Sequence, residues 1–178
     1  MIMVNNCISS GRPLLAVLAL ATFGLLAPAV RAGQQQALPA SIGLLAADGT
    51  TVTTANIGGV EKWLLIYVRV GNHASEVLLG QIDEATFPGV TSNIVVVVGG
   101  ISADRLKQTF DKFPGLSKAS WYADPSLDFP AGMKITGAPV MFGMQDRNVR
   151  WDLSGALFDS AKLKSIINSW FNPPQANP

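Results

Sequence analysis

The chain has 178 residues, of which 13 are basic and 12 acidic, so its formal net charge is +1 at pH 7. With so little net charge and no cluster of basic residues, it lacks the electrostatic footprint of a nucleic-acid-binding protein. The same balance argues against an anionic lipid surface as its main partner.

The first 32 residues have the layout of a secretory signal peptide. Arg12 ends a short basic lead, residues 13–30 form an apolar stretch, and Val30, Arg31 and Ala32 supply a cleavage site. An earlier cleavage site lies at residues 27–29. Because the apolar stretch approaches membrane-spanning length, an uncleaved anchor is the alternative, but Pro28 and the small residues favour cleavage. We therefore expect a periplasmic or secreted protein.

Cleavage after Ala32 removes 32 of the 178 residues and leaves a single domain of 146, residues 33–178. It also removes Cys7, the only cysteine, together with Arg12 and Arg31, so that 11 basic residues remain against 12 acidic ones. The mature chain then has no thiol, which excludes every thiol-based mechanism and argues against an enzyme of that kind. A domain of this size buries a core without disulfides. We expect no membrane insertion after signal cleavage.

The first half of the mature chain predicts a hairpin followed by a strand–helix–strand unit. The hairpin spans residues 42–53 around the turn signal Asp48 and Gly49. Residues 63–68 form a continuous run of branched and aromatic residues, typical of a strand buried on both faces. A helix over 74–85 and a second buried strand over 94–98 then imply a parallel pair with a right-handed crossover.

The second half predicts two helices, a short strand and a terminal hairpin, separated by proline and glycine signals. The first helix is capped by Ser102 and ends near Phe113, and a strand over 119–123 follows it. A loop over 124–138 then leads into a hairpin that pairs 139–144 with 149–153. The last helix spans 159–171 and is ended by Pro173 and Pro174.

Three local motifs in this order of elements indicate a family. Residues 134–140 (KITGAPV) lead into the terminal hairpin, Gly155 follows it, and Asp124 ends the short strand. Together they resemble the thioredoxin-like superfamily, in its exported thiol-disulfide oxidoreductase or redoxin-type subgroup, where the proline before the fourth strand is cis. The resemblance covers roughly residues 38–171. It implies an α/β three-layer sandwich with a mixed central sheet and an N-terminal β-hairpin extension.

The family's Cys-x-x-Cys motif is missing, and its place is taken by Asn72, His73, Ala74 and Ser75. The redox chemistry needs a thiolate at a helix N-terminus and a second thiol that resolves the mixed disulfide. An amide is not a nucleophile, and a serine hydroxyl without a base does not replace a thiol. We therefore expect four degenerate active-site positions and no catalytic residue, with Asn72 capping the helix and Ser75 an ordinary first-turn residue.

His73 is the only histidine of the chain. As a base for Ser75 it stands two residues away, which on a helix directs the two side chains to different sides. As a metal ligand it lacks partners, because only carboxylates such as Glu76 remain. We expect an exposed polar residue, and neither a metal nor another cofactor.

Pro139 is a different case, because the role that the resemblance implies for it needs no thiol. In the family, the backbone beside this proline pairs with an extended peptide. Ala138, Pro139 and Val140 are therefore candidate peptide-binding residues. The alternative is a proline that only turns the loop.

Three functions are compatible with these features. The first is a redox-inactive binding or accessory module that holds an extended segment of an unknown protein or peptide partner beside Pro139. The second, by family assignment, is a thiol-disulfide oxidoreductase, against which the missing cysteines argue. The third is a structural subunit of an envelope complex, which apolar surface would favour. The 48% hydrophobic content overstates that surface, because the percentage includes the signal peptide.

Overall fold

The computed structural model describes residues 31–32, 36–59, 61–85, 87, 89–155, 157 and 159–173. Most of the predicted signal peptide lies outside the described residues. Its last two residues form a strand. The strands are β1 (Arg31–Ala32), β2 (Gly43–Ala46), β3 (Thr51–Thr53), β4 (Lys62–Arg69), β5 (Ile94–Gly99), β6 (Ser120–Asp124), β7 (Val140–Gln145) and β8 (Asn148–Ser154). The helices are α1 (His73–Glu84), α2 (Ala103–Phe110), α3 (Asp128–Gly132) and α4 (Ser160–Phe171).

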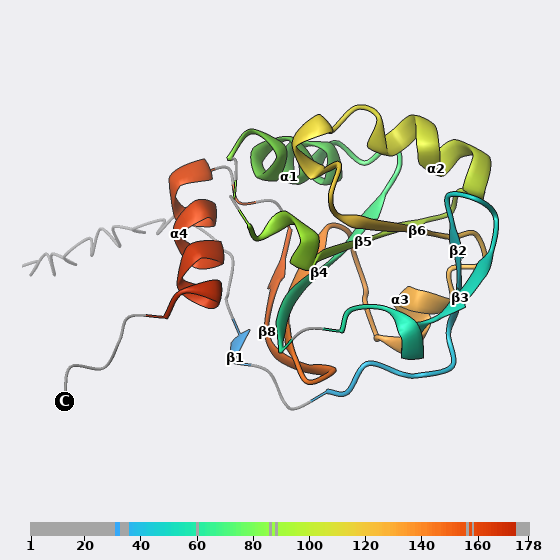
Figure 1. The fold of residues 1–178 in the computed structure, drawn as a ribbon, viewed down its shortest axis with the longest axis horizontal. Helices are drawn as coiled ribbons and strands as arrows, with labels where there is room; N and C mark the ends of the chain where they lie inside the picture. The colour runs from blue at the N-terminus through green and yellow to red at the C-terminus, as the bar shows by residue number, and fades with distance from the viewer. Residues whose placement is uncertain are drawn as a thin grey trace, which may run out of the picture.

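One mixed sheet organises the molecule, in the strand order β1-β8-β7-β4-β5-β6-β2-β3. The pairs β4–β5 and β5–β6 are parallel, whereas the other pairs are antiparallel. The predicted central strands are confirmed as β4 and β5, and the crossover between them is α1 (Figure 1). Residues 63–68 and 94–99 are all buried, which explains their continuous apolar runs.

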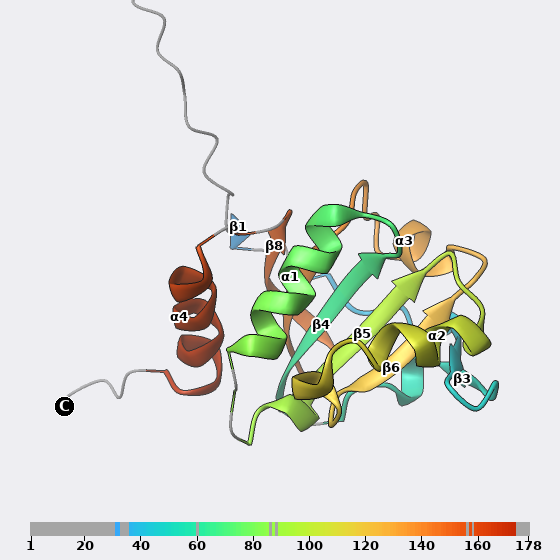
Figure 2. The same ribbon diagram turned by 90° about the horizontal axis from the view of Figure 1, so that it is seen from above.

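Apolar side chains cover both faces of this sheet and give the molecule three layers. On one face, even-numbered residues of β4 pack against α1, α2 and α4, with Leu78, Leu106 and Leu163 in the same cluster. On the other face, odd-numbered residues of β4 pack against Phe129 of α3 and against the N-terminal segment that includes Leu38. Figure 2 looks onto the first face, with α1 and α2 in front of β4, β5 and β6. The predicted α/β sandwich is confirmed.

Both predicted hairpins are present. In the first, Gly49 has a φ of +83° and Thr51–Thr53 pairs with β2. In the second, Asp146 and Arg147 occupy the turn with φ values of 49° and 65°. Positive φ at both central residues is the geometry that matches the twist of a two-residue hairpin. The Arg147 guanidinium also donates hydrogen bonds to the backbone oxygens of residues 54 and 55, at 2.8 and 2.9 Å.

The predicted loop over 124–138 is partly wrong, because it contains the helix α3. Pro130 and Gly132 suggested an irregular segment, but Pro is tolerated in the first turn of a helix, where its missing N–H leaves no bond unmade. The Asp124 carboxylate accepts hydrogen bonds from the N–H groups of Asp128 and Phe129, both at 3.1 Å. These bonds hold the start of the helix.

The cap expected at Ser102 is present in position only: it is the N-cap residue of α2, but its side chain makes no cap hydrogen bond. Within the described part of the chain, no helix is long and apolar enough to cross a bilayer.

Candidate functional site

The start of α1 holds the four predicted degenerate positions, Asn72, His73, Ala74 and Ser75. Asn72 is the N-cap residue, and its Oδ1 accepts the Ser75 N–H at 3.0 Å. The predicted cap is therefore confirmed, and it satisfies one of the N–H groups that a helix start leaves unpaired.

Ser75 is more than an ordinary first-turn residue. Its side chain is 1% exposed, and its Oγ accepts the Arg69 N–H at 3.2 Å. The hydroxyl thus ties the first turn of α1 to the end of β4 and is withdrawn from solvent. A buried hydroxyl held in this way has a structural role.

His73 is exposed, as predicted, and its side chain makes no hydrogen bond or ion pair with another described residue. No three potential ligands among the described residues are close enough together to hold a metal ion. The start of α1 therefore presents neither a nucleophile nor a base in a working arrangement.

A hollow of about 300 Å³ lies beside Ser75, between α1 and the end of α2. Its deep side is apolar, and its mouth carries the exposed side chains of Glu76 and Lys112. Val70, 44% exposed, extends the apolar surface at this end of the sheet. The lining residues are Val68, Arg69, Val70, Ser75, Glu76, Leu79, Val98, Thr109, Lys112 and Phe113.

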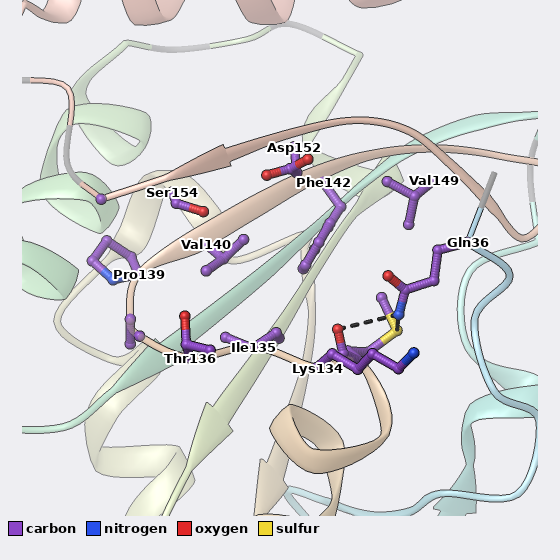
Figure 3. Close-up of a pocket in the computed structure, with 14 residues that line it drawn as sticks. Gln36, Lys134, Ile135, Thr136, Pro139, Val140, Phe142, Val149, Asp152 and Ser154 are labelled. Atoms are coloured by element: carbon purple, nitrogen blue, oxygen red, sulfur yellow. Dashed lines mark hydrogen bonds between the residues drawn. The ribbon is translucent and has the colours of Figure 1, made fainter. Parts of the chain in front are cut away.

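A larger groove, of about 690 Å³, lies on the α3 side of the sheet (Figure 3). Its floor is apolar, with Val140 and Phe142 from β7 and Val149 from β8. One wall is the loop that precedes β7, and the other is the second half of β8. The lining comprises Gln36, Val140, Phe142, Val149, Asp152, Ser154, Gly155 and residues 133–139. All three candidate peptide-binding residues, Ala138, Pro139 and Val140, belong to this groove.

The loop wall of the groove offers open backbone groups. Residues 136–138 make no backbone hydrogen bond with another described residue. Pro139 follows a cis peptide bond from Ala138, and its carbonyl oxygen accepts the Gly155 N–H at 2.8 Å. Gly155 adopts a φ of +85°, which favours glycine at this position. The wall is therefore anchored at Pro139, and just before it no backbone group pairs with any residue that the structure describes.

The degenerate positions and Pro139 lie at the same end of two neighbouring strands. Val140 is paired with Tyr67, so the chain before Val140 passes beside the end of β4, where the loop to α1 begins. They do not share a cavity, however, because α1 covers one face of the sheet and the groove opens on the other. The larger groove therefore has none of residues 72–75 in its lining, although it contains all three candidate peptide-binding residues.

Sequence reasoning missed the polar residues of the groove, among them Gln36, Lys134, Asp152 and Ser154. Figure 3 shows Asp152 and Ser154 on the β8 wall, Thr136 on the loop wall and Gln36 at one end. The Gln36 amide donates to the Met133 carbonyl at 3.1 Å across 97 residues of sequence. Strand alternation in the sequence indicates only that Trp151 and Asp152 lie on opposite faces of the sheet. The structure shows which face each occupies, because Trp151 faces Trp170 of α4, at 5.9 Å between ring centroids.

Asp124 is fully buried beside the start of α3. Its burial raises the pKa of this carboxyl, against the opposing effect of the hydrogen bonds from Phe129 and Asp128. Burial also raises the pKa of Tyr67, against the opposing charge of Arg69 and with a smaller contribution from the Asp124 charge. Tyr67 stacks on Phe129 at 5.9 Å, so these residues form a packed support beneath α3 and no open site.

Comparison with known proteins places this geometry among known folds. No family model matches the chain, and no curated protein matches it. A secreted Mycobacterium tuberculosis disulfide oxidoreductase homologous to E. coli DsbE is similar, with a TM-score of 0.58 and 11% identity over 71% of this chain and 94% of that one. A thiol:disulfide interchange protein from Bacteroides sp. has a TM-score of 0.56 and 15% identity, over 80% and 93%. The chain has a thioredoxin fold.

A third thioredoxin-like structure, an uncharacterized protein from Porphyromonas gingivalis, has a TM-score of 0.59 and 18% identity over 78% of this chain and 94% of that one. The expected thioredoxin-like architecture is thereby confirmed. Likeness at these identities concerns fold, whereas chemistry depends on the residues at the site. In this thioredoxin-like chain no cysteine follows Cys7, so α1 carries no thiol.

Proposed function

We propose that this protein is an exported, redox-inactive thioredoxin-like module, residues 33–178 after signal cleavage, that binds an extended segment of a protein or peptide partner. The observation that carries the proposal is the 690 Å³ groove lined by Ala138, Pro139 and Val140. Its volume lies within the range of ordinary ligand sites, about 300–1,000 Å³.

The groove has the parts that recognition of an extended chain requires. The backbone groups of residues 136–138, which have no backbone partner among the described residues, could form main-chain hydrogen bonds with a bound segment. Such bonds supply affinity without regard to sequence. The apolar floor of Val140, Phe142 and Val149 suits alternate side chains of a strand. Lys134 on one wall and Asp152 on the other offer charges of opposite sign, which fix orientation more than affinity.

The alternative of a thiol-disulfide oxidoreductase finds support only in the shared fold. Disulfide exchange needs a thiolate nucleophile, and the chain has no cysteine after Cys7. An insulin-reduction assay on the mature protein is expected to give background turbidity, and activity above background would restore this alternative.

Peptide capture tests the proposal directly. Random dodecapeptides displayed on phage are panned on residues 33–178, and a recovered peptide becomes the probe in calorimetry. We expect Ser154→Trp, which fills the β8 wall, to weaken its binding by at least about tenfold. Ser117→Trp is the matched control, because Ser117 is also exposed but lies outside the groove.

A second variant separates the groove from the degenerate positions. The combined change Asn72→Ala, His73→Ala and Ser75→Ala is expected to leave the probe's affinity unchanged, since none of these residues lines the groove. Panning that recovers no binding peptide, or affinity that is lost in this folded triple variant and kept in Ser154→Trp, would overturn the proposal.

A further inference from the structure

The outer edge of β8 is occupied by the residues that precede the predicted cleavage site. β1 pairs antiparallel with β8 in the register Arg31 with Asp152 and Ala32 with Trp151. Cleavage after Ala32 separates these two residues from the domain. The mature protein therefore begins without the strand that covers this part of the edge.

The rest of the edge remains covered by the segment that stays attached. The Val149 N–H donates to the Gln36 carbonyl at 2.9 Å, and the Leu38 N–H donates to the Arg147 carbonyl at 2.9 Å. Ala37 bridges to Asn148. Loss of β1 thus opens the second half of β8 at Trp151 and Asp152, beyond the part of the edge that residues 36–38 cover.

This open half of β8 is also a wall of the groove. Asp152 and Ser154 line the groove, and Asp152 is half-buried while Ser154 is exposed. A residue paired directly opposite Asp152 on an added strand projects from the same face of the sheet. Its side chain therefore lies over the groove and beside the Asp152 carboxylate, where a lysine or arginine is favoured.

We propose that removal of residues 1–32 opens the outer edge of β8 to an extended, basic peptide strand of a partner, which adds antiparallel with a lysine or arginine opposite Asp152. This proposal rests on the proposed function. The bound segment pairs with β8 by strand addition, in the same register as β1. Unpaired edge strands are the usual template for such addition.

The chain's own strand, supplied as a separate peptide, is the probe. The hexapeptide Ala-Val-Arg-Ala-Gly-Gln, the sequence of residues 29–34, is titrated into ¹⁵N-labelled residues 33–178. We expect shift changes over residues 151–154 and slowed exchange of those amides among them that point away from β7. Replacement of the peptide's arginine by glutamate is expected to weaken binding by about fivefold or more.

Protein variants distinguish the contribution of the Asp152 carboxylate to binding from that of the β8 backbone edge. Asp152→Asn is expected to weaken the peptide by about fivefold and to remove its preference for arginine over glutamate. Asp104→Asn is the matched control, because Asp104 is exposed in α2 on the other face of the sheet. A longer chain, residues 29–178, that keeps β1 is expected to bind the hexapeptide at least about tenfold more weakly than the mature chain, through intramolecular competition.

Each remaining outcome decides between this inference and the proposed function. If the hexapeptide leaves residues 151–154 unperturbed while phage-selected peptides still bind the groove, strand addition is wrong and the proposed function stands. If neither binds, both are wrong. If the mature chain forms a dimer by light scattering and the same amides are protected without peptide, the edge serves a second copy of this chain and the partner peptide is excluded.

Discussion

Asn72 and Ser75 together hold the junction of β4 and α1 with two side-chain hydrogen bonds. The amide of Asn72 accepts the Ser75 N–H, and the hydroxyl of Ser75 accepts the Arg69 N–H. Both oxygens therefore satisfy backbone donors at the junction of β4 and α1, where unpaired donors are costly. At the residue scale, these two side chains make a capped helix start that is tied to the preceding strand.

The cap at Asn72 makes a measurable contribution to stability. Asn72→Ala removes the side-chain acceptor of the Ser75 N–H, which keeps only its bond to the Asn72 carbonyl oxygen, and is expected to lower the free energy of unfolding by about 1 kcal/mol. Asn72→Asp keeps an acceptor of similar capping strength and is expected to remain within about 0.5 kcal/mol of the original. Urea denaturation followed by circular dichroism measures both values, and equal losses in the two variants would contradict the assigned cap.

Asp124 gives the second residue-scale prediction, a dependence of stability on pH. Burial raises its pKa in the folded protein, so the folded state holds the proton more tightly than the unfolded chain does. Its contribution to the free energy of unfolding is therefore full below the ordinary carboxyl pKa and is lost as pH rises through the raised pKa.

Asp124→Asn removes this titration. Between the ordinary carboxyl pKa and the raised one, the free energy of unfolding of the original protein is expected to fall relative to that of the variant. Denaturation of both proteins at matched pH values gives that difference, in which the other carboxylates cancel. A difference that stays constant, or changes in the opposite direction, would show that the burial of Asp124 is compensated in the folded state.

At the element scale, Trp151 of β8 packs against both β7 and α4. Trp151 of β8 lies against Gly143 of β7, where an added Cβ would collide with its indole ring. On its other side it meets Trp170 of α4 edge-on. Trp170 in turn donates to the Trp63 carbonyl at 3.3 Å, and its own carbonyl accepts from Lys62 at 3.1 Å. The last helix is thus fastened to the start of β4.

Gly143→Ala tests this contact, and Gly80→Ala is a comparison variant whose stability is expected to change in the opposite direction. Gly143→Ala is expected to destabilise the protein by about 1–3 kcal/mol, because the strand or the indole has to move. Gly80→Ala, in α1 with no neighbour within 4 Å of its Cβ, is expected to stabilise it by about 0.5–1 kcal/mol. Thermal unfolding ranks the two variants, and a neutral Gly143→Ala would mean that Trp151 has another low-energy position.

The elements also show where sequence reasoning succeeds. Hairpins, buried strands and the Asn72 cap follow from residues within a few positions of one another, and all were predictable. The helix α3 was missed because Asp124, four and five residues ahead of its partners, holds its start. The groove was only partly predictable: Pro139 is in a recognisable motif, whereas Gln36 meets Met133 across 97 residues.

At the scale of the whole molecule, the two apolar clusters share the same strands. Alternate residues of β4, β5 and β7 enter one cluster or the other, so neither face can lose its packing without disturbing the sheet that supports both. Both clusters contain tryptophan. Trp63 lies in the cluster on the α3 face, and the cluster on the face of the other helices includes Trp121, Trp151 and Trp170. Cys7 is the only cysteine of the chain, so no intramolecular disulfide supplements this packing.

This arrangement predicts that the mature chain unfolds in one cooperative step that is indifferent to redox conditions. Tryptophan fluorescence and far-ultraviolet circular dichroism are expected to give the same urea midpoint, because both clusters depend on one sheet. Addition of dithiothreitol is expected to leave that midpoint unchanged, since residues 33–178 contain no cysteine. Two separate transitions would mean that one face folds independently of the other. A midpoint that shifts with the reductant would contradict a domain whose stability rests on packing alone.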